Sequence, residues 1–149
     1  MIIVVVKGRT NEVSGILKRV GTTYIPVMNV RESVDWYIDH LGAKLNYQDQ
    51  NKAIIDLAGQ SFFLVKASDN ENSNFMDAEG NKRFSQTFEV DGVEELFIFN
   101  KQLKDAGVEV GKVENRGHPG RNFTFNDLNG NSFDVWSELS PSYNRRGNE

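Results

Sequence analysis

Two short runs near the C-terminal end of the chain, at 122–126 and 132–137, alternate polar with large apolar residues. The turn sequence DLNG at 127–130 joins them. Alternation with period two around an Asn-Gly pair predicts a β-hairpin. Because successive strand side chains point to opposite faces, one face should join the core, and the other, centred on Asp134, should line a polar pocket. The expected core face carries Phe123, Phe125, Phe133 and Val135.

Two segments of the chain share one plan of strand, helix and three further strands. The first begins with a strand at 22–27, a capping pair at Asn29 and Glu32, an apolar helical stripe and a stop at Gly42. The second repeats this with a strand at 85–90, the pair Asp91 and Glu94, a helix over 93–106 and Gly107. The remaining strands are expected at 44–48, 53–57 and 61–66, and at 108–113, 122–126 and 132–137.

This repeat predicts an α+β fold of two βαβββ modules, at 19–67 and 83–139, within one domain spanning 19–139. Residues 68–82 are the expected connector, 1–18 an N-terminal extension and 140–149 a C-terminal tail. One helix per four strands covers only one face of a sheet, so the opposite faces should pack together or enclose a cavity. An enclosed, half-polar cavity would suit a small organic molecule.

Composition narrows the classes of partner and compartment. Of the 149 residues, 17 are basic and 21 acidic, and the net charge of −4 without a basic block argues against nucleic acid. The chain has no cysteine, which excludes disulfides and thiolate metal sites and makes the cytoplasm the expected compartment. The apolar run 2–6 is too short for a signal peptide, and no run approaches membrane-spanning length.

Several sequence pieces, taken in order, resemble one known family. They are YIPVMN at 24–29, WY at 36–37 with LG at 41–42, FEVD at 88–91, and DLNGN at 127–131 with FDVW at 133–136. Residues 19–139 thereby resemble the vicinal oxygen chelate superfamily, which includes glyoxalase I, bleomycin-resistance proteins, fosfomycin-resistance transferases and extradiol dioxygenases. The resemblance implies paired βαβββ modules that curve around a ligand cavity, often within a homodimer.

The resemblance also locates the positions at which the family's metal enzymes carry ligands. These positions lie near Thr22 and at Phe63 in the first module, and near Ser85 and at Asp134 in the second. Only Asp134 is a credible ligand, whereas a divalent site needs about three protein donors. The resemblance therefore implies a retained scaffold without a metal, and no other cofactor is expected.

The leading hypothesis is a protein that sequesters a small organic ligand without a metal, as the bleomycin-resistance proteins do, with aromatic or cationic compounds as candidates. Asp134 would then accept a hydrogen bond from the ligand or pair with its cationic group. One alternative is a lyase, isomerase or dioxygenase-like enzyme, with Asp134 as general base, or with a metal if the ligand positions are misaligned by one residue. Another is an interaction module with an occluded cavity. Whether the protein is an enzyme stays open.

The segment 115–122 is richer in functional groups than a strand connection needs. Arg116 and Arg121 flank His118 and could close over a carboxylate or phosphate of a ligand, or the arginines could pair with surface acids. Trp136 could form an aromatic wall or close a barrel mouth, while Tyr37 should belong to the core. The expected ligand-binding residues are Tyr24, Phe63, Ser85, Thr87, Thr124, Ser132, Asp134, Trp136, Arg116, His118 and Arg121.

Overall fold

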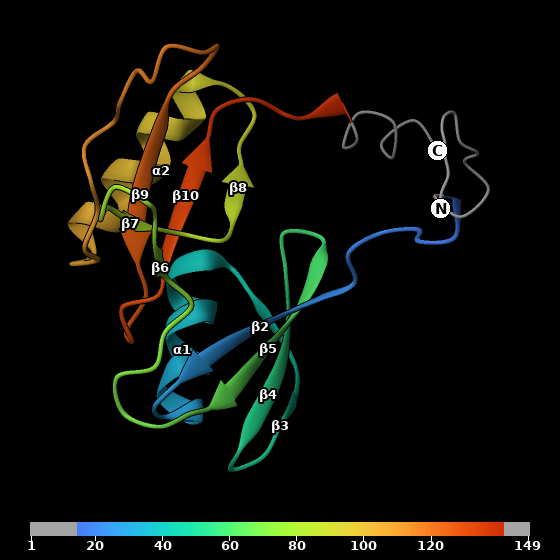
Figure 1. Cartoon of the computed structure of the whole chain (residues 1–149). Coiled ribbons are helices and arrows are strands. Elements are labelled where there is room, and N and C mark those ends of the chain that lie inside the picture. Colours follow the sequence, from blue (N-terminus) through green and yellow to red (C-terminus); the bar gives the residue numbers. More distant parts are fainter. Residues whose placement is uncertain (1–14, 142–149) are drawn as a thin grey trace.

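The computed structural model describes residues 15–141 (Figure 1). Most of the expected N-terminal extension and C-terminal tail therefore lie outside the described residues. The described chain forms two helices and three sheets, and the α+β architecture expected from the repeat is confirmed. None of the helices within 15–141 is long and apolar enough to cross a membrane.

The first module forms a four-stranded sheet in the order β2-β5-β4-β3, in which β2 and β5 are parallel and the other pairs antiparallel. Every element predicted here is present, and the boundaries differ from prediction by at most one residue. The elements are β2 (Thr22–Val27), α1 (Val30–Leu41), β3 (Lys44–Gln48), β4 (Lys52–Leu57) and β5 (Gln60–Lys66).

Local signals explain the ends of α1. The side chain of Asn29 accepts a hydrogen bond from the backbone N–H of Glu32 at 2.9 Å, which satisfies an otherwise unpaired donor of the first turn. Gly42 ends the helix in the left-handed region, at φ 74°, which glycine adopts without steric cost. Both signals act over four residues or fewer, which is why the sequence predicts them well.

The second module forms a three-stranded sheet in the order β8-β10-β9, with β8 parallel to β10. The strand predicted at 108–113 is wrong: this segment contributes one isolated bridge to β9, at Val110, and Glu114 just after it forms another. The carbonyl of Gly111 accepts from Asn100 Nδ2 of α2 at 3.1 Å, which diverts it from a continuous ladder. The elements are β8 (Thr87–Glu89), α2 (Val93–Asp105), β9 (Asn122–Asn126) and β10 (Ser132–Trp136).

The predicted capping pair of α2 is also wrong. Gly92, at φ 104°, is the N-cap and offers no side chain, so the helix starts one residue later than an Asp91 cap would place it. Glu95, rather than Glu94, reaches back and accepts from the backbone N–H of Asp91 at 2.9 Å. With Gly92 as the N-cap, Glu95 and not Glu94 is the third helical residue, the position from which a side chain reaches back to the backbone before the helix.

The connector contains a small ribbon formed by β6 (Phe75–Met76) and β7 (Lys82–Arg83). Asn74, just before the ribbon, donates from Nδ2 to the carbonyl of Gly130 at 2.7 Å and accepts from the backbone N–H of Ser132 at 2.8 Å. The connector is therefore tied to the start of β10 by hydrogen bonds rather than passing freely between the modules.

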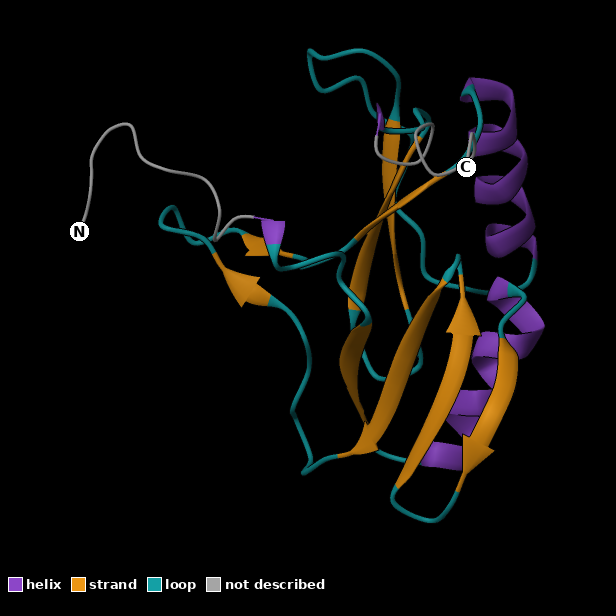
Figure 2. Cartoon of the chain, turned by 90° about the vertical axis from the view of Figure 1, so that its right-hand side faces the viewer, coloured by secondary structure: helices purple, strands orange, loops and turns teal. Residues whose placement is uncertain are grey.

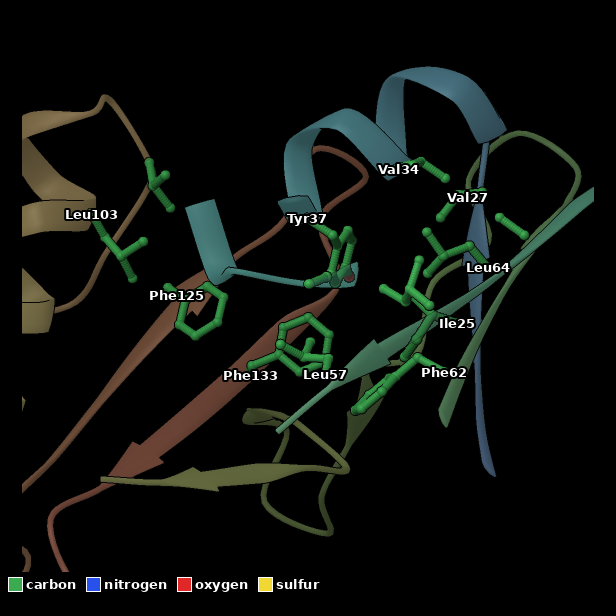
Figure 3. Packing of buried hydrophobic residues seen from close by; sticks show 14 of the residues in the cluster. Ile25, Val27, Val34, Tyr37, Leu57, Phe62, Leu64, Leu103, Phe125 and Phe133 are labelled. Carbon is green, nitrogen blue, oxygen red and sulfur yellow. The ribbon is translucent and has the colours of Figure 1, made fainter. Parts of the chain in front are cut away.

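One hydrophobic core serves both modules. The helix-side faces of the two sheets meet in it, with Phe62 and Phe88 at 6.0 Å between ring centroids and Tyr37 edge-on to Phe133 at 6.4 Å. Figure 3 shows side chains from both helices and both sheets gathered there. The expected core face of the hairpin and the core position of Tyr37 are confirmed by their burial.

Because the helix-side faces of both sheets are buried in this core, the opposite sheet faces point away from it. In Figure 2 the four-stranded sheet lies in front of α1, so its opposite face is turned toward the viewer. The modules thus share a core through their helix sides, and their other sides face away from it.

Tyr37→Phe tests the polar contact within this core. Tyr37 donates to Asp127 Oδ2 at 2.6 Å, and both side chains are buried. Loss of that donor should lower the free energy of unfolding by about 1–3 kcal/mol at neutral pH, measured by urea denaturation. Tyr24→Phe, at a position 64% exposed, is the matched control and should change stability little.

The same variant has a pH signature. Burial, then the charge of Asp127 and the hydrogen bond to it, raise the pKa of Tyr37 well above its usual 10.0. The unfolded chain loses this proton near pH 10.0 while the folded chain keeps it, so the stabilisation is complete below that pH and is lost as pH rises toward the raised pKa. The stability difference between wild type and Tyr37→Phe should therefore shrink in strongly alkaline buffer, and a constant difference would contradict the assignment.

Candidate functional site

The outward face of the second sheet is a polar surface built by strand register. Thr87, Asp134 and Thr124 form one row across β8, β10 and β9. The next row on the same face joins Glu89, Trp136 and Asn122. Asp134 is thus the central residue of β10, the central strand of this sheet, and it lies on the face that the hairpin pattern predicted for it.

Side chains of the same chain form hydrogen bonds and an ion pair with the Asp134 carboxylate. Its Oδ2 accepts from Asn122 Nδ2 at 2.9 Å and from Thr87 Oγ1 at 3.1 Å. Its Oδ1 lies 3.2 Å from Nη1 of Arg116, and only 4% of the Asp134 side chain is exposed. The 115–121 loop folds back and places its own cation on this carboxylate, and direct contact between Asp134 and a ligand stays a prediction.

Arg116 is held from several directions. Its Nε donates to Glu114 Oε1 at 2.9 Å, and its guanidinium lies 6.0 Å from the ring centroid of Phe84. The Arg116 side chain is 29% exposed, so part of it still meets solvent. Sequence reasoning anticipated that the loop arginines would bind anions or pair with acids, but it missed Glu114, Asn122 and Phe84. Only the spacing of Glu114 and Arg116 hinted at this arrangement.

The rest of the loop packs down on the end of β10. Trp136 Nε1 donates to the carbonyl of Pro119 at 2.9 Å, and His118 lies edge-on to the Trp136 ring at 5.8 Å. Gly120 fits so closely that an added Cβ would lie 2.6 Å from Ser137 Oγ. Arg121 donates from its backbone to the same hydroxyl at 2.8 Å. Trp136 therefore anchors the loop, and the structure brings Arg116, His118 and Trp136 together on one face.

The remaining predicted ligand residues are divided between two surfaces. Ser132 is buried and donates to Asn126 Oδ1 at 2.6 Å, so its hydroxyl is committed within the hairpin. Ser85 is exposed just before β8. Tyr24 and Phe63 lie on the first sheet, with ring centroids 4.9 Å apart.

An apolar row crosses all four strands of the first sheet on the face opposite α1. Register places Tyr24 beside Phe63, Phe63 beside Ile54, and Ile54 beside Tyr47. Tyr24 is 64% exposed and Tyr47 47% exposed. Phe63 and Ile54 between them are half-buried, so the row joins two exposed aromatic side chains through partly covered apolar ones. Adjoining apolar side chains at a surface are a feature of interaction sites.

Two cavities on the described surface lie away from the sequence-predicted site. One, of about 690 Å³, is bounded by residues 28–31 at the start of α1, by 48–50 and by Lys66. The other, of about 440 Å³, lies between α2 and the segment 110–113. None of the expected ligand-binding residues lines either cavity. The cavity expected between the modules of one chain is therefore neither of these two.

The residues at the family's ligand positions do not fit a divalent metal ion. Phe63 has no donor atom and contacts Tyr24, while Thr22 and Ser85 are neutral and exposed. Asp134 Oδ1 is buried, lacks a well-formed hydrogen bond and faces the Arg116 cation, not a second acidic ligand. Within residues 15–141, no group of three or more His, Asp or Glu side chains is arranged to hold a metal.

A double-mutant cycle tests the ion pair. Arg116→Gln removes the counter-charge of a buried carboxylate and should lower the free energy of unfolding by about 1–3 kcal/mol. Asp134→Asn should also destabilise, and the double variant should lose less than the sum, as contacting residues do. Lys101→Gln is the control, because its pair with Asp105 is exposed and such pairs contribute little. Additive effects in chemical denaturation would show that the pair is not coupled.

Comparison with known proteins places this geometry in context. No curated protein matches the sequence significantly. The fosfomycin resistance protein FosX from Listeria monocytogenes is 15% identical, with a TM-score of 0.69 over 83% of this chain and 96% of FosX. Lactoylglutathione lyase from Agrobacterium tumefaciens is 15% identical, with a TM-score of 0.64 over 81% of this chain and 94% of its own. At these identities the likeness shows the fold alone.

The sequence itself also matches a family model. Residues 19–135 match the model described as Glyoxalase/Bleomycin resistance protein/Dioxygenase superfamily. The match spans both helices and every strand from β2 to β9, and it reaches into β10. The resemblance indicated by the sequence motifs is confirmed, and the chain belongs to the glyoxalase/bleomycin resistance protein/dioxygenase superfamily.

Proposed function

We propose that this chain binds a small organic molecule and holds it without a metal and without altering it. The observation that carries the proposal is that Asp134 is buried and already paired with side chains of the same chain. This residue is the one acidic group at the family's ligand positions, and its carboxylate already receives Arg116, Asn122 and Thr87. A second and third metal donor are missing from the neighbouring positions, and water would compete effectively with so few ligands.

The same contacts argue against Asp134 as a general base. A base must reach the proton that it removes and must have a free lone pair. Oδ2 of Asp134 accepts two hydrogen bonds, and Oδ1 is paired with a permanent cation at 3.2 Å. Proton abstraction would require Arg116 to leave a carboxylate that is only 4% exposed. Binding of a ligand that is not converted requires no such rearrangement of Arg116.

We propose that a second copy completes the ligand site. The apolar row Tyr24, Phe63, Ile54 and Tyr47 lies on one sheet, and the polar rows around Asp134 lie on the other. In a two-fold symmetric pair, the apolar row of one copy would face the polar rows of its partner. That pairing would cover the exposed apolar side chains and would place an aromatic wall opposite hydrogen-bonding groups, as small-molecule sites require.

Metal analysis and ligand recovery test the metal-free binding proposal together. Protein purified without chelator should contain no stoichiometric zinc, nickel, manganese or iron. Small aromatic compounds that raise the melting temperature in a thermal-shift screen should be recovered chemically unchanged by mass spectrometry. One tightly bound metal ion per chain, or conversion of the recovered compound, would overturn the proposal in favour of an enzyme.

Light scattering tests the dimer. Wild-type protein at micromolar concentration should have the mass of two chains, and Tyr24→Lys should shift it toward one chain, because a charge in the apolar row opposes burial. Leu128→Lys is the matched control, since Leu128 is 54% exposed but lies in the hairpin turn away from that row. A wild-type monomer, or equal effects of the two variants, would remove the support for this assembly.

A further inference from the structure

We infer that Arg116 takes the place of a metal ion in this site, and that the ligand carries a carboxylate or phosphate group that binds its guanidinium. This inference rests on the proposed function, since it assumes that the ligand lies against the polar face of the second sheet. It goes beyond that proposal by naming the ligand's charge and the residue that recognises it. It also reverses the sequence-based preference for a cationic ligand.

Asp134 requires a compensating positive charge. A carboxylate with 4% of its side chain exposed needs a compensating positive charge, because an unpaired buried charge is strongly destabilising. A divalent ion would supply that charge in a metal enzyme. Here Arg116 supplies it, and a guanidinium stays protonated at all physiological pH values. The positive centre is therefore covalently part of the chain.

Arg116 has N–H donors left after it pairs with its two acidic partners. A guanidinium carries five N–H donors on three nitrogens. Nε donates to Glu114, and Nη1 faces Asp134, whereas Nη2 contacts no acceptor among residues 15–141. The side chain is 29% exposed, so it is not sealed from solvent. Glu114, Asp134 and Phe84 fix the guanidinium plane, and an immobilised planar donor suits the paired oxygens of a carboxylate or phosphate.

Anions and cations would meet Arg116 in different ways. A cationic ligand would have to displace Arg116 from Asp134, and the displaced guanidinium would then keep Glu114 as its acidic partner. An anionic ligand adds to the Nη2 side without breaking either pair. Arg83 also lies against the Phe84 ring, at 5.6 Å, so two cations border this aromatic side chain. The arrangement therefore favours an anion over a cation.

A matched set of probes tests the ligand's charge. Benzoate, phenyl phosphate, benzyl alcohol and benzylamine share one ring and differ in charge, and their binding to the full-length protein can be measured by calorimetry or by amide chemical shifts. Benzoate and phenyl phosphate should bind, and benzylamine and benzyl alcohol should bind more weakly. Arg116→Gln should weaken anion binding about tenfold or more, as loss of a charged hydrogen bond does.

Three further variants make the result specific. Arg116→Lys should keep the attraction but lose the planar contact, and should fall between wild type and Arg116→Gln. Lys101→Gln removes an exposed cation of α2 that pairs with Asp105, and it should leave anion binding unchanged. If Arg116→Gln fails to fold, the double variant Arg116→Gln with Asp134→Asn carries a neutral pair, and it should fold and bind anions weakly.

The outcomes separate this inference from the proposed function. Unchanged anion binding in Arg116→Gln, tighter binding of benzylamine than of benzoate, or failure of both anions to bind wild type would overturn the role of Arg116. Each of those results leaves metal-free binding of some other ligand intact. A stoichiometric metal or a converted ligand would overturn the proposed function, even if the probes showed the expected charge preference.

Discussion

The single core shared by the two modules is the constraint on which the rest of the structure depends. Each module has one helix, and the helix-side faces of both sheets carry the large apolar side chains. Burying both faces in one core removes the most apolar surface from water, which is the dominant favourable term in folding. The consequence is that the polar face around Asp134 and the apolar row around Tyr24 must both point outward. The positions of both site surfaces therefore follow from the way in which the core is buried.

Asp127 fixes the hairpin relative to that core. Its carboxylate accepts from Tyr37 of α1, from the Asn131 side chain and from the backbone N–H groups of Asn129 and Asn131. Asn131 in turn donates to the carbonyl of Pro26 in β2 at 2.9 Å. The turn is thus bonded to the first module through buried polar groups, which are expensive to leave unsatisfied. This network sets the position of β10 and hence of Asp134.

The pairing of Asp134 with Arg116 changes what the family scaffold can do in this chain. At the corresponding position a metal enzyme needs a carboxylate that is free to bind a cation, whereas this carboxylate is already neutralised. A guanidinium offers directional N–H donors and no Lewis acidity at an open coordination position. The fold therefore remains that of the superfamily while the chemistry of the polar face becomes that of hydrogen bonding and ion pairing.

The sequence by itself determined the local structure well. Its successes depend on only a few neighbouring residues each, so a short stretch of sequence is enough to predict them. They are the Asn29 cap, the Gly42 stop and the period-two runs at 122–126 and 132–137. The resemblance carried by those motifs also identified the superfamily. The failures begin where a distant group intervenes, as when Asn100 of α2 takes the Gly111 carbonyl and the segment 108–113 does not become a strand.

Tertiary structure alone decided the state of the site. Alternation placed Asp134 on the outward face, but it could not show that the 115–121 loop returns to that face and sets Arg116 3.2 Å from the carboxylate. It also could not show where the two described cavities lie, which is at the start of α1 and beside α2, and not between the outward faces of the two sheets. The physical reason is that loop return and module packing are set by contacts between residues far apart in sequence, which no short-range pattern encodes.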